Sequence, residues 1–222
     1  MRCFDEDFLT FFRELAGNNH KEWFHANKLR YERKVKDPFY AFVGEMIERI
    51  HREDPRVHPE VKNSVFRINR DIRFSKDKSP YKLHVAAAIS PGGRRNTMCE
   101  PGNYFHLSAD SVMVCGGLFR PDKETLLKVR RHLVKHPGSL RGIIATVGVR
   151  SKWGEIRRER NKVLPKEFKG AAEKNPLLYN KAFYVQAELP PETVLRSDLA
   201  ALLMRYFRSD RPLNDYLRQA RA

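Results

Sequence analysis

The chain has 222 residues, and its 41% hydrophobic content, including 14 phenylalanines, is enough to bury a core without disulfides or structural metals. With 43 Lys and Arg against 27 Asp and Glu, the formal net charge is +16, and the 32% charged fraction is compatible with a folded protein. Cys3, Cys99 and Cys115 form no C-x-x-C pattern, which excludes a disulfide framework and favours free thiols in a reducing compartment. The first residues are acidic where a signal peptide is basic, and no apolar run is long enough to span a bilayer. We therefore expect a cytoplasmic protein without a membrane segment.

The positive charge is concentrated late in the chain. Residues 120–170 carry 15 basic and 5 acidic side chains, a net charge of +10. Such a surface attracts nucleic acid or acidic partners through a salt-sensitive electrostatic interaction. The alternative is a solvated, solubilising face of a basic protein.

The first third of the sequence has helical periodicity. Apolar residues recur at helical spacing over residues 8–15 and again over residues 39–50, which predicts two helices. Asn19 is the expected N-cap of a helix between them, because Gly17 and Asn18 break the first pattern. One face of that middle helix carries Trp23, Asn27 and Tyr31. Helix packing explains this face most simply, and its polar atoms could alternatively line a pocket.

The middle third changes to a period of two. Residues 66–74 alternate in a way that predicts a strand. Its buried face would carry Phe66, Ile68, Arg70, Ile72 and Phe74, and its opposite face Arg67, Asn69, Asp71 and Arg73. A buried Arg70 requires an acidic partner. The candidates are Glu22, Glu45 and Asp77.

Further strands and helices follow in the same way. Strands are predicted over residues 83–89, 104–109, 111–119 and 181–189, and helices over residues 121–136, 140–144 and 197–208. Gly116 and Gly117 inside one strand indicate a bulge or a close backbone approach. Clustered strands flanked by N-terminal and C-terminal helices predict an α+β fold, a single domain over residues 1–222 with a mainly antiparallel sheet.

The densest cluster of functional side chains lies between residues 67 and 82. It holds six cations and only two acids, Asp71 and Asp77, and such density favours a bound anion because like charges repel. The expected ligand carries phosphate or carboxylate. The predicted ligand-binding residues are Arg67, Asp71, Arg73, Lys78 and Tyr81. In the alternative interpretation Asp71 bridges Arg67 and Arg73, and the motif only stabilises the fold.

Four motifs together resemble a known family. The R-x-x-R-D-x-R-F-x-x-x-K-x-x-Y pattern runs from Arg67 to Tyr81, and W-F-x-x-N-K-x-x-Y from Trp23 to Tyr31. The elements G-G-L-F-x-P at residues 116–121 and L-P-K-x-F at residues 164–168 complete the set. This combination is similar to an uncharacterised bacterial family, domain-of-unknown-function family 2461. The resemblance implies a conserved hypothetical protein of about this length with no assigned activity. The stretch from Ser151 to Lys169 is more basic than that pattern implies.

Signatures of catalysis are weak. His132 and His136 have the i, i+4 spacing of zinc ligands, but the adjacent residues are cationic and no Glu follows the first histidine, so no metal site is predicted. No P-loop, dinucleotide or nucleophile-elbow motif identifies a cofactor or a catalytic residue. Asp71 could act as a general base with Tyr81 or His84 as the acid, but nothing in the spacing demands it. Three functions therefore stay open: an anion-binding domain, a nucleic-acid-associated protein that uses residues 120–170, and a structural or interaction module.

Overall fold

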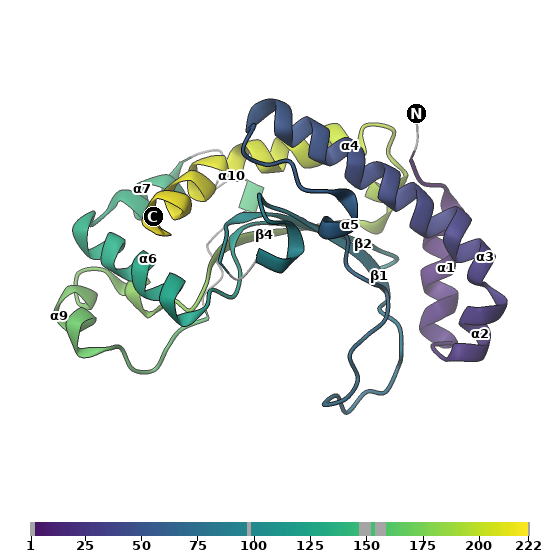
Figure 1. The fold of residues 1–222 in the computed structure, drawn as a ribbon, viewed down its shortest axis with the longest axis horizontal. Helices are drawn as coiled ribbons and strands as arrows, with labels where there is room; N and C mark the ends of the chain where they lie inside the picture. Colours follow the sequence, from purple (N-terminus) through teal and green to yellow (C-terminus); the bar gives the residue numbers. More distant parts are fainter. Residues whose placement is uncertain (1–2, 97–98, 147–151, 154–158, 222) are drawn as a thin grey trace.

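The computed structural model describes residues 3–96, 99–146, 152–153 and 159–221 (Figure 1). Its centre is an antiparallel sheet in which β1 (His84–Ile89), β2 (Gly102–Ser108), β3 (Val112–Leu118) and β4 (Phe183–Leu189) pair in chain order. Helices α4 and α10 cross one face of this sheet. The predicted α+β class, with an antiparallel sheet flanked by helices from both ends of the chain, is confirmed. No helix among the described residues is long and apolar enough to cross a bilayer.

The N-terminal third is helical, as predicted, and consists of α1 (Glu6–Gly17), α2 (Lys21–Ala26), α3 (Lys28–Tyr31), a π-helical turn (Glu32–Lys36) and α4 (Asp37–Glu53). The predicted N-cap at Asn19 is wrong, because the ring of His20 accepts the hydrogen bond from the backbone N–H of Trp23. Asn19 instead binds the backbone of Tyr81 twice: its amide donates to the carbonyl at 3.0 Å, and its oxygen accepts from the N–H at 3.1 Å. This pair of bonds ties the first helices to the chain that enters β1.

The remaining helices are α5 (Val61–Ser64), α6 (Lys123–Lys135), α7 (Ser139–Ala145), α9 (Lys169–Ala172) and α10 (Leu199–Arg221), with 3-10 turns at Gly93–Asn96, Lys166–Phe168, Pro176–Tyr179 and Pro191–Leu195. Helix α10 is longer than the predicted 197–208. It continues through Pro212 because its apolar stripe continues: Leu213, Leu217 and Ala220 are all buried. Packing of that stripe offsets the hydrogen bond that proline removes.

The core lies between the sheet and its two long helices. Phe105 of β2 contacts Phe39 and Phe42 of α4, with ring centroids 5.9 and 5.7 Å apart, and Phe207 of α10 at 6.3 Å. Such edge and tilted contacts are the favoured geometries of aromatic packing. Because side chains alternate along a strand, the neighbours of Phe105 in β2, Tyr104 and His106, point to the opposite face of the sheet.

The strand predicted over residues 66–74 is wrong. Only isolated bridges form there, Val65 with Ala87 and Asn69 with Tyr81, and beyond the second bridge the chain leaves the sheet as a loop (Figure 1). We call residues 67–82 the projecting loop. It extends away from α4 and α10. Ile68 and Tyr81 at its base are buried, but no layer covers its outer part, and Phe74 is 96% exposed. Alternation alone therefore did not produce a buried face.

Candidate functional site

The projecting loop satisfies its own charges locally. Asp71 accepts two side-chain hydrogen bonds from Arg73, at 3.0 and 2.7 Å, and one from its backbone N–H at 3.3 Å. These bonds lower the pKa of the Asp71 carboxyl to about 2 and raise the pKa of Arg73. Arg67 affects Asp71 only through longer-range attraction, so the Arg–Asp–Arg bridge considered from the sequence is half formed.

A second internal pair involves Arg70, which is half-exposed and not buried as predicted. Its guanidinium bonds the carboxylate of Asp77, one of the three predicted partners, and lies 3.4 Å from the Ser75 hydroxyl. Hydrogen bonds from Ser79, and then from Arg70, lower the pKa of Asp77 to about 2. Both acids of the motif are therefore used inside the loop.

The remaining predicted ligands lie apart from one another. Lys78 donates to the carbonyl of Ile72 at 3.1 Å, closing the end of the projecting loop. Tyr81 is 4% exposed, and its ring stacks on Phe24 with centroids 4.0 Å apart and an interplanar angle of 16°. Burial, and then the charge of Glu22, raises the pKa of the Tyr81 hydroxyl. The structure therefore brings Asp71, Arg73 and Lys78 into one loop, and places Tyr81 at its base in contact with the core.

A second polar surface lies on the sheet face turned away from α4 and α10. We call it the open sheet face, because neither of these two helices covers it (Figure 1). Its central side chains are half-buried, and they include His84, Tyr104, His106, Met113 and Cys115. The rings of His84 and His106 stack with centroids 4.6 Å apart, and the Tyr104 hydroxyl lies 3.3 Å from Nδ1 of His106. The sequence predicts the strands that carry His84 and His106 but not the contact between the two rings, because the pairing of β1 with β2 sets that contact.

Burial controls the protonation of this histidine pair. Desolvation, the neighbouring His106 and the charge of Lys82 lower the pKa of His84 to about 4. Desolvation also lowers the pKa of His106, although Glu188 opposes the effect. Both imidazoles are therefore neutral at pH 7, and each ring can donate one hydrogen bond and accept one.

A group of cations lies beside the histidines at the base of the projecting loop. The half-buried ammonium of Lys82 donates to the carbonyl of Arg67 at 2.7 Å and lies 5.6 Å from the ring centroid of Phe66. Burial lowers the pKa of Lys82, and repulsion from Arg67 and Arg94 lowers it further. Over the part of the chain that the structure describes, no carboxylate forms an ion pair with Lys82 or Arg67. We call Arg67, Lys82 and Arg94 the cation cluster.

The guanidinium of Arg94 is fixed in place by backbone carbonyls. It donates to the carbonyl of Lys62 and, at 2.7 Å, to that of Val65. Gly93 has φ +64°, and a Cβ there would lie 2.6 Å from the carbonyl oxygen of Asn63. The turn before Arg94 therefore requires glycine and holds the cation against the start of the projecting loop.

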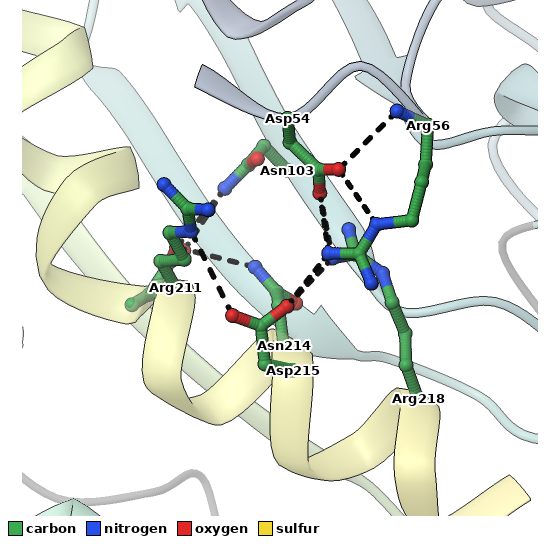
Figure 2. A network of polar contacts seen from close by, with 8 residues as sticks. Asp54, Arg56, Asn103, Arg211, Asn214, Asp215 and Arg218 are labelled. Carbon is green, nitrogen blue, oxygen red and sulfur yellow. Dashed lines mark hydrogen bonds and ion pairs between the residues drawn. The ribbon is translucent and has the colours of Figure 1, made fainter.

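A second polar group is buried on the other side of the sheet, between β2 and α10 (Figure 2). Asp210 is fully buried and accepts hydrogen bonds from Asn103, at 3.0 and 3.2 Å, and from Asn214, at 3.2 Å. Desolvation raises the pKa of Asp210 well above its usual value, because these bonds do not replace full hydration. The carboxyl is therefore held in its neutral form more strongly than in water.

Ion pairs separate this carboxyl from solvent. Asp54, at the end of α4, pairs with Arg56 at 2.7 Å and with Arg218 at 2.8 Å, while Asp215 bonds Arg56 and Arg218 at 3.0 Å each (Figure 2). The hydrogen bonds from Arg56 and the charge of Arg218 lower the pKa of Asp54, although burial opposes them. This network joins α4 to α10.

The cleft beside the network is small. Asn103, Asn214 and Arg218 line it, and its volume is about 30 Å³. That space holds one or two water molecules and no organic ligand. In the described part of the structure, Oδ1 of Asn214 and Nε of Arg218 are buried without a protein partner, so water there would satisfy them. We call Asp210, Asn103 and Asn214 the Asp210 cluster, and we interpret it as structural.

The glycine pair of β3 belongs to this structural group. A Cβ on Gly116 would lie 1.4 Å from Oδ2 of Asp210, and a Cβ on Gly117, where φ is +117°, would lie 2.3 Å from the carbonyl of Phe183. The strand pairs continuously with both neighbours through these positions. The close approach predicted at Gly116 and Gly117 is therefore present: the carboxyl of Asp210 approaches Gly116, and the backbone of Phe183 approaches Gly117.

Two other sequence features give no site. His132 and His136 lie with ring centroids 4.5 Å apart, yet the described residues contain no group of three or more side chains that could hold a metal ion. In the basic stretch 120–170, Arg130 is buried and donates to backbone carbonyls, and Arg131 approaches Glu167 at 3.7 Å. Part of that charge is thus used internally. Residues 147–151 and 154–158, which include part of the basic stretch from Ser151 to Lys169, lie outside the described part.

The fold and these two polar clusters define a basic α+β protein with one helix-covered sheet face and one open face. The sequence profile of the family described as Conserved hypothetical protein (DUF2461) matches residues 7–216. The chain belongs to this family, as the four motifs predicted. A comparison with curated proteins gave no match.

Proposed function

We propose that this protein binds a phosphate- or carboxylate-bearing ligand at the cation cluster, at the edge of the open sheet face. The observation that carries the proposal is the environment of Lys82. Its ammonium is half-buried and repelled by Arg67 and Arg94, and no described carboxylate pairs with it. A bound anion would convert this repulsion into attraction, because an opposite charge within a few ångströms favours the charged form of lysine.

The histidine pair supports an oxygen-rich ligand. His84 lies close enough to Lys82 for the lysine charge to lower its pKa, so a ligand at Lys82 also approaches the imidazoles. Neutral imidazoles and the Tyr104 hydroxyl can donate hydrogen bonds to phosphate or carboxylate oxygens. The proposal assigns binding, and no catalytic residue, to this surface.

Of the five residues predicted from the sequence, Arg67 contacts the ligand directly in this proposal. Asp71, Arg73 and Lys78 shape the loop above it through their internal bonds. Tyr81 anchors the base of the loop against Phe24. The five motif residues would thus act in two ways: Arg67 contacts the ligand, and the other four hold the cations in position.

The test is calorimetric titration with inorganic phosphate, a nucleoside monophosphate and citrate, comparing the wild type with Lys82→Met. We expect one of these anions to bind and the substitution to weaken its binding at least about tenfold, the loss typical of one charge-assisted contact. Without ligand, Lys82→Met should have a higher Tm than the wild type, because it removes a desolvated, repelled charge.

The matched control is Lys76→Met, an exposed lysine of the same loop that makes the same change in net charge. Its affinity for the anion should equal that of the wild type. Equal losses in both variants would reduce the effect to general electrostatics, and an absence of binding by all three anions would reject the proposal.

A further inference from the structure

The end of the projecting loop presents an aromatic ring to solvent. Phe74 is 96% exposed, and the guanidinium carbon of Arg73 lies 5.8 Å from its ring centroid. One face of the ring therefore has a cation beside it, and the rest is open. Phe74 contributes nothing to the packed core, so its ring is available to a ligand.

This ring is carried by an ordered loop. The Arg70–Asp77 pair and the Lys78–Ile72 hydrogen bond connect the two arms on either side of Phe74, and the Arg73–Asp71 pair stiffens the first arm. These bonds use both acids of the loop and leave Lys76, two residues after Phe74, exposed and without an ion pair among the described residues. The loop thus offers a held aromatic surface with excess positive charge.

The same arrangement occurs a second time. Phe119, directly after β3, is 48% exposed, and the guanidinium carbon of Arg120 lies 5.1 Å from its ring centroid. The ring of Tyr184 supports Phe119 edge-on at 5.0 Å. Tyr40, which is 37% exposed, is an exposed aromatic residue of α4 on the covered side of the sheet. It serves below as the comparison residue.

We propose that Phe74 and Phe119 are stacking platforms for the bases of a single-stranded nucleic acid whose phosphates contact Arg73, Lys76 and Arg120. Each feature meets one requirement of such a ligand: an exposed ring gives a base a flat partner, and an adjacent guanidinium or ammonium attracts the neighbouring phosphate. The net charge of +16 attracts the polyanion over longer distances. Neither ring belongs to the cation cluster, and the proposal does not depend on that cluster.

A membrane surface fits these observations less well. Loops and helices that insert into lipid present several apolar side chains together. Here a single phenylalanine is enclosed by Arg73, Ser75 and Lys76, and two carboxylates lie within three residues of it, at Asp71 and Asp77. Single-stranded nucleic acid requires only one ring per base and tolerates this polar surrounding.

The test is fluorescence anisotropy with a labelled 15-nucleotide oligothymidylate at low and moderate salt. Phe74→Ala should weaken binding about 5- to 100-fold, the range for loss of one base–aromatic stack. Phe74→Leu should lose as much, because it keeps apolar area without a flat π face, and Phe74→Trp should retain the affinity. Tyr40→Ala, the control, should bind as the wild type does.

Several results would overturn the proposal. They are an absence of oligothymidylate binding by the wild type at low salt, equal affinities of Phe74→Ala and Tyr40→Ala, and full affinity in Phe74→Leu. Binding to phosphatidylserine-containing vesicles that survives Phe74→Leu, without oligonucleotide binding, would assign the loop to a membrane instead. Lys82→Met should leave oligothymidylate affinity within about twofold while it weakens small-anion binding at least about tenfold, so the two proposals fail separately.

Discussion

The projecting loop and the Asp210 cluster each place aspartate close to arginine, with opposite results. Asp71 is exposed, accepts hydrogen bonds from Arg73, and has its pKa lowered to about 2. Asp210 is fully buried, accepts hydrogen bonds from the neutral amides of Asn103 and Asn214, and has its pKa raised well above the usual value. Charged hydrogen bonding dominates in the first case and desolvation in the second.

The difference separates a surface whose side chains can exchange their hydrogen-bond partners from a buried cluster whose side chains cannot. The loop bonds are local and solvated, so breaking one costs little and leaves the loop free to contact a partner. The Asp210 contacts connect residues more than a hundred positions apart in a buried site, where an unpaired polar group is costly. We therefore expect stability effects to concentrate at Asp210 and binding effects at the loop.

The largest effect should come from Gly116→Ala. Its new methyl group would meet Oδ2 of Asp210 at 1.4 Å, so either β3 or α10 must move, at a cost of about 3 kcal/mol or more in unfolding free energy. Urea denaturation measures this loss. The control is Gly142→Ala in α7, where a Cβ meets nothing within 4 Å and should be neutral or stabilise by up to about 1 kcal/mol.

Adding Asp210→Ala to Gly116→Ala isolates the contact. Because the carboxyl then no longer occupies the space of the methyl group, the double variant should lose less than the sum of the two single losses, by about 1 kcal/mol or more. Additive losses would mean that Gly116 is required for another reason than the approach of Asp210.

Asp210→Asn should give the next largest effect, with a definite sign. The folded pKa of Asp210 lies above the unfolded value of 3.8, so the native state retains a proton that the unfolded chain releases as pH rises. Wild-type stability from this group is therefore complete below about pH 4 and is lost at higher pH. Asparagine does not titrate, so the variant should melt roughly 3–6 °C above the wild type at pH 8 and match it near pH 4. A difference that is equal at both pH values would contradict the raised pKa.

The sequence predicted elements whose burial follows a local period. Residues 8–15 and 39–50 form helices, and the paired strands at 104–109 and 111–119 form close to the predicted bounds, because one face of each lies against the core. Residues 66–74 also alternate, yet they form only an isolated bridge at Asn69, and the chain beyond it has no layer over it, so Phe74 is exposed. Alternation shows which side chains of a segment could share a buried face. Whether another strand or helix packs against that face depends on the tertiary structure.

The candidate sites were predictable to different degrees. The density of cations around Arg67 indicated an anion site, and local spacing included Asp77 among the partners of Arg70. The pairing of His84 with His106, by contrast, depends on the register of β1 and β2. The partner of Gly116 is almost a hundred residues away in α10, and no spacing rule connects them. Local charge patterns could therefore be read from the sequence, and contacts between distant elements could not.

The open sheet face is intermediate in burial between the projecting loop and the Asp210 cluster. The protonation of His84 tests this. Its pKa of about 4 in the folded state lies below the unfolded value of 6.5, so the unfolded chain takes up a proton first as pH falls. Stability should fall from about pH 6.5 to about pH 4, by a total of about 2–3 kcal/mol. His84→Asn should flatten this slope, whereas His25→Asn, at an exposed position of α2, should not. If an NMR titration gave His84 a pKa near 6.5, the result would contradict the burial of this side chain.

The smallest stability effect should come from the loop itself. Arg73→Ala removes a bidentate pair with Asp71, but both groups are exposed and the unfolded chain hydrates them equally well, so Tm should change by no more than about 1 °C. Arg70→Ala should lower Tm by a few degrees, because Arg70 is half-buried and joins the two arms through Asp77 and Ser75. Differential scanning fluorimetry of both variants compares the two changes in Tm. A large loss in Arg73→Ala would show that the bond to Asp71 supports the fold, and the loop would then resemble the Asp210 cluster and lose the freedom that a binding surface requires.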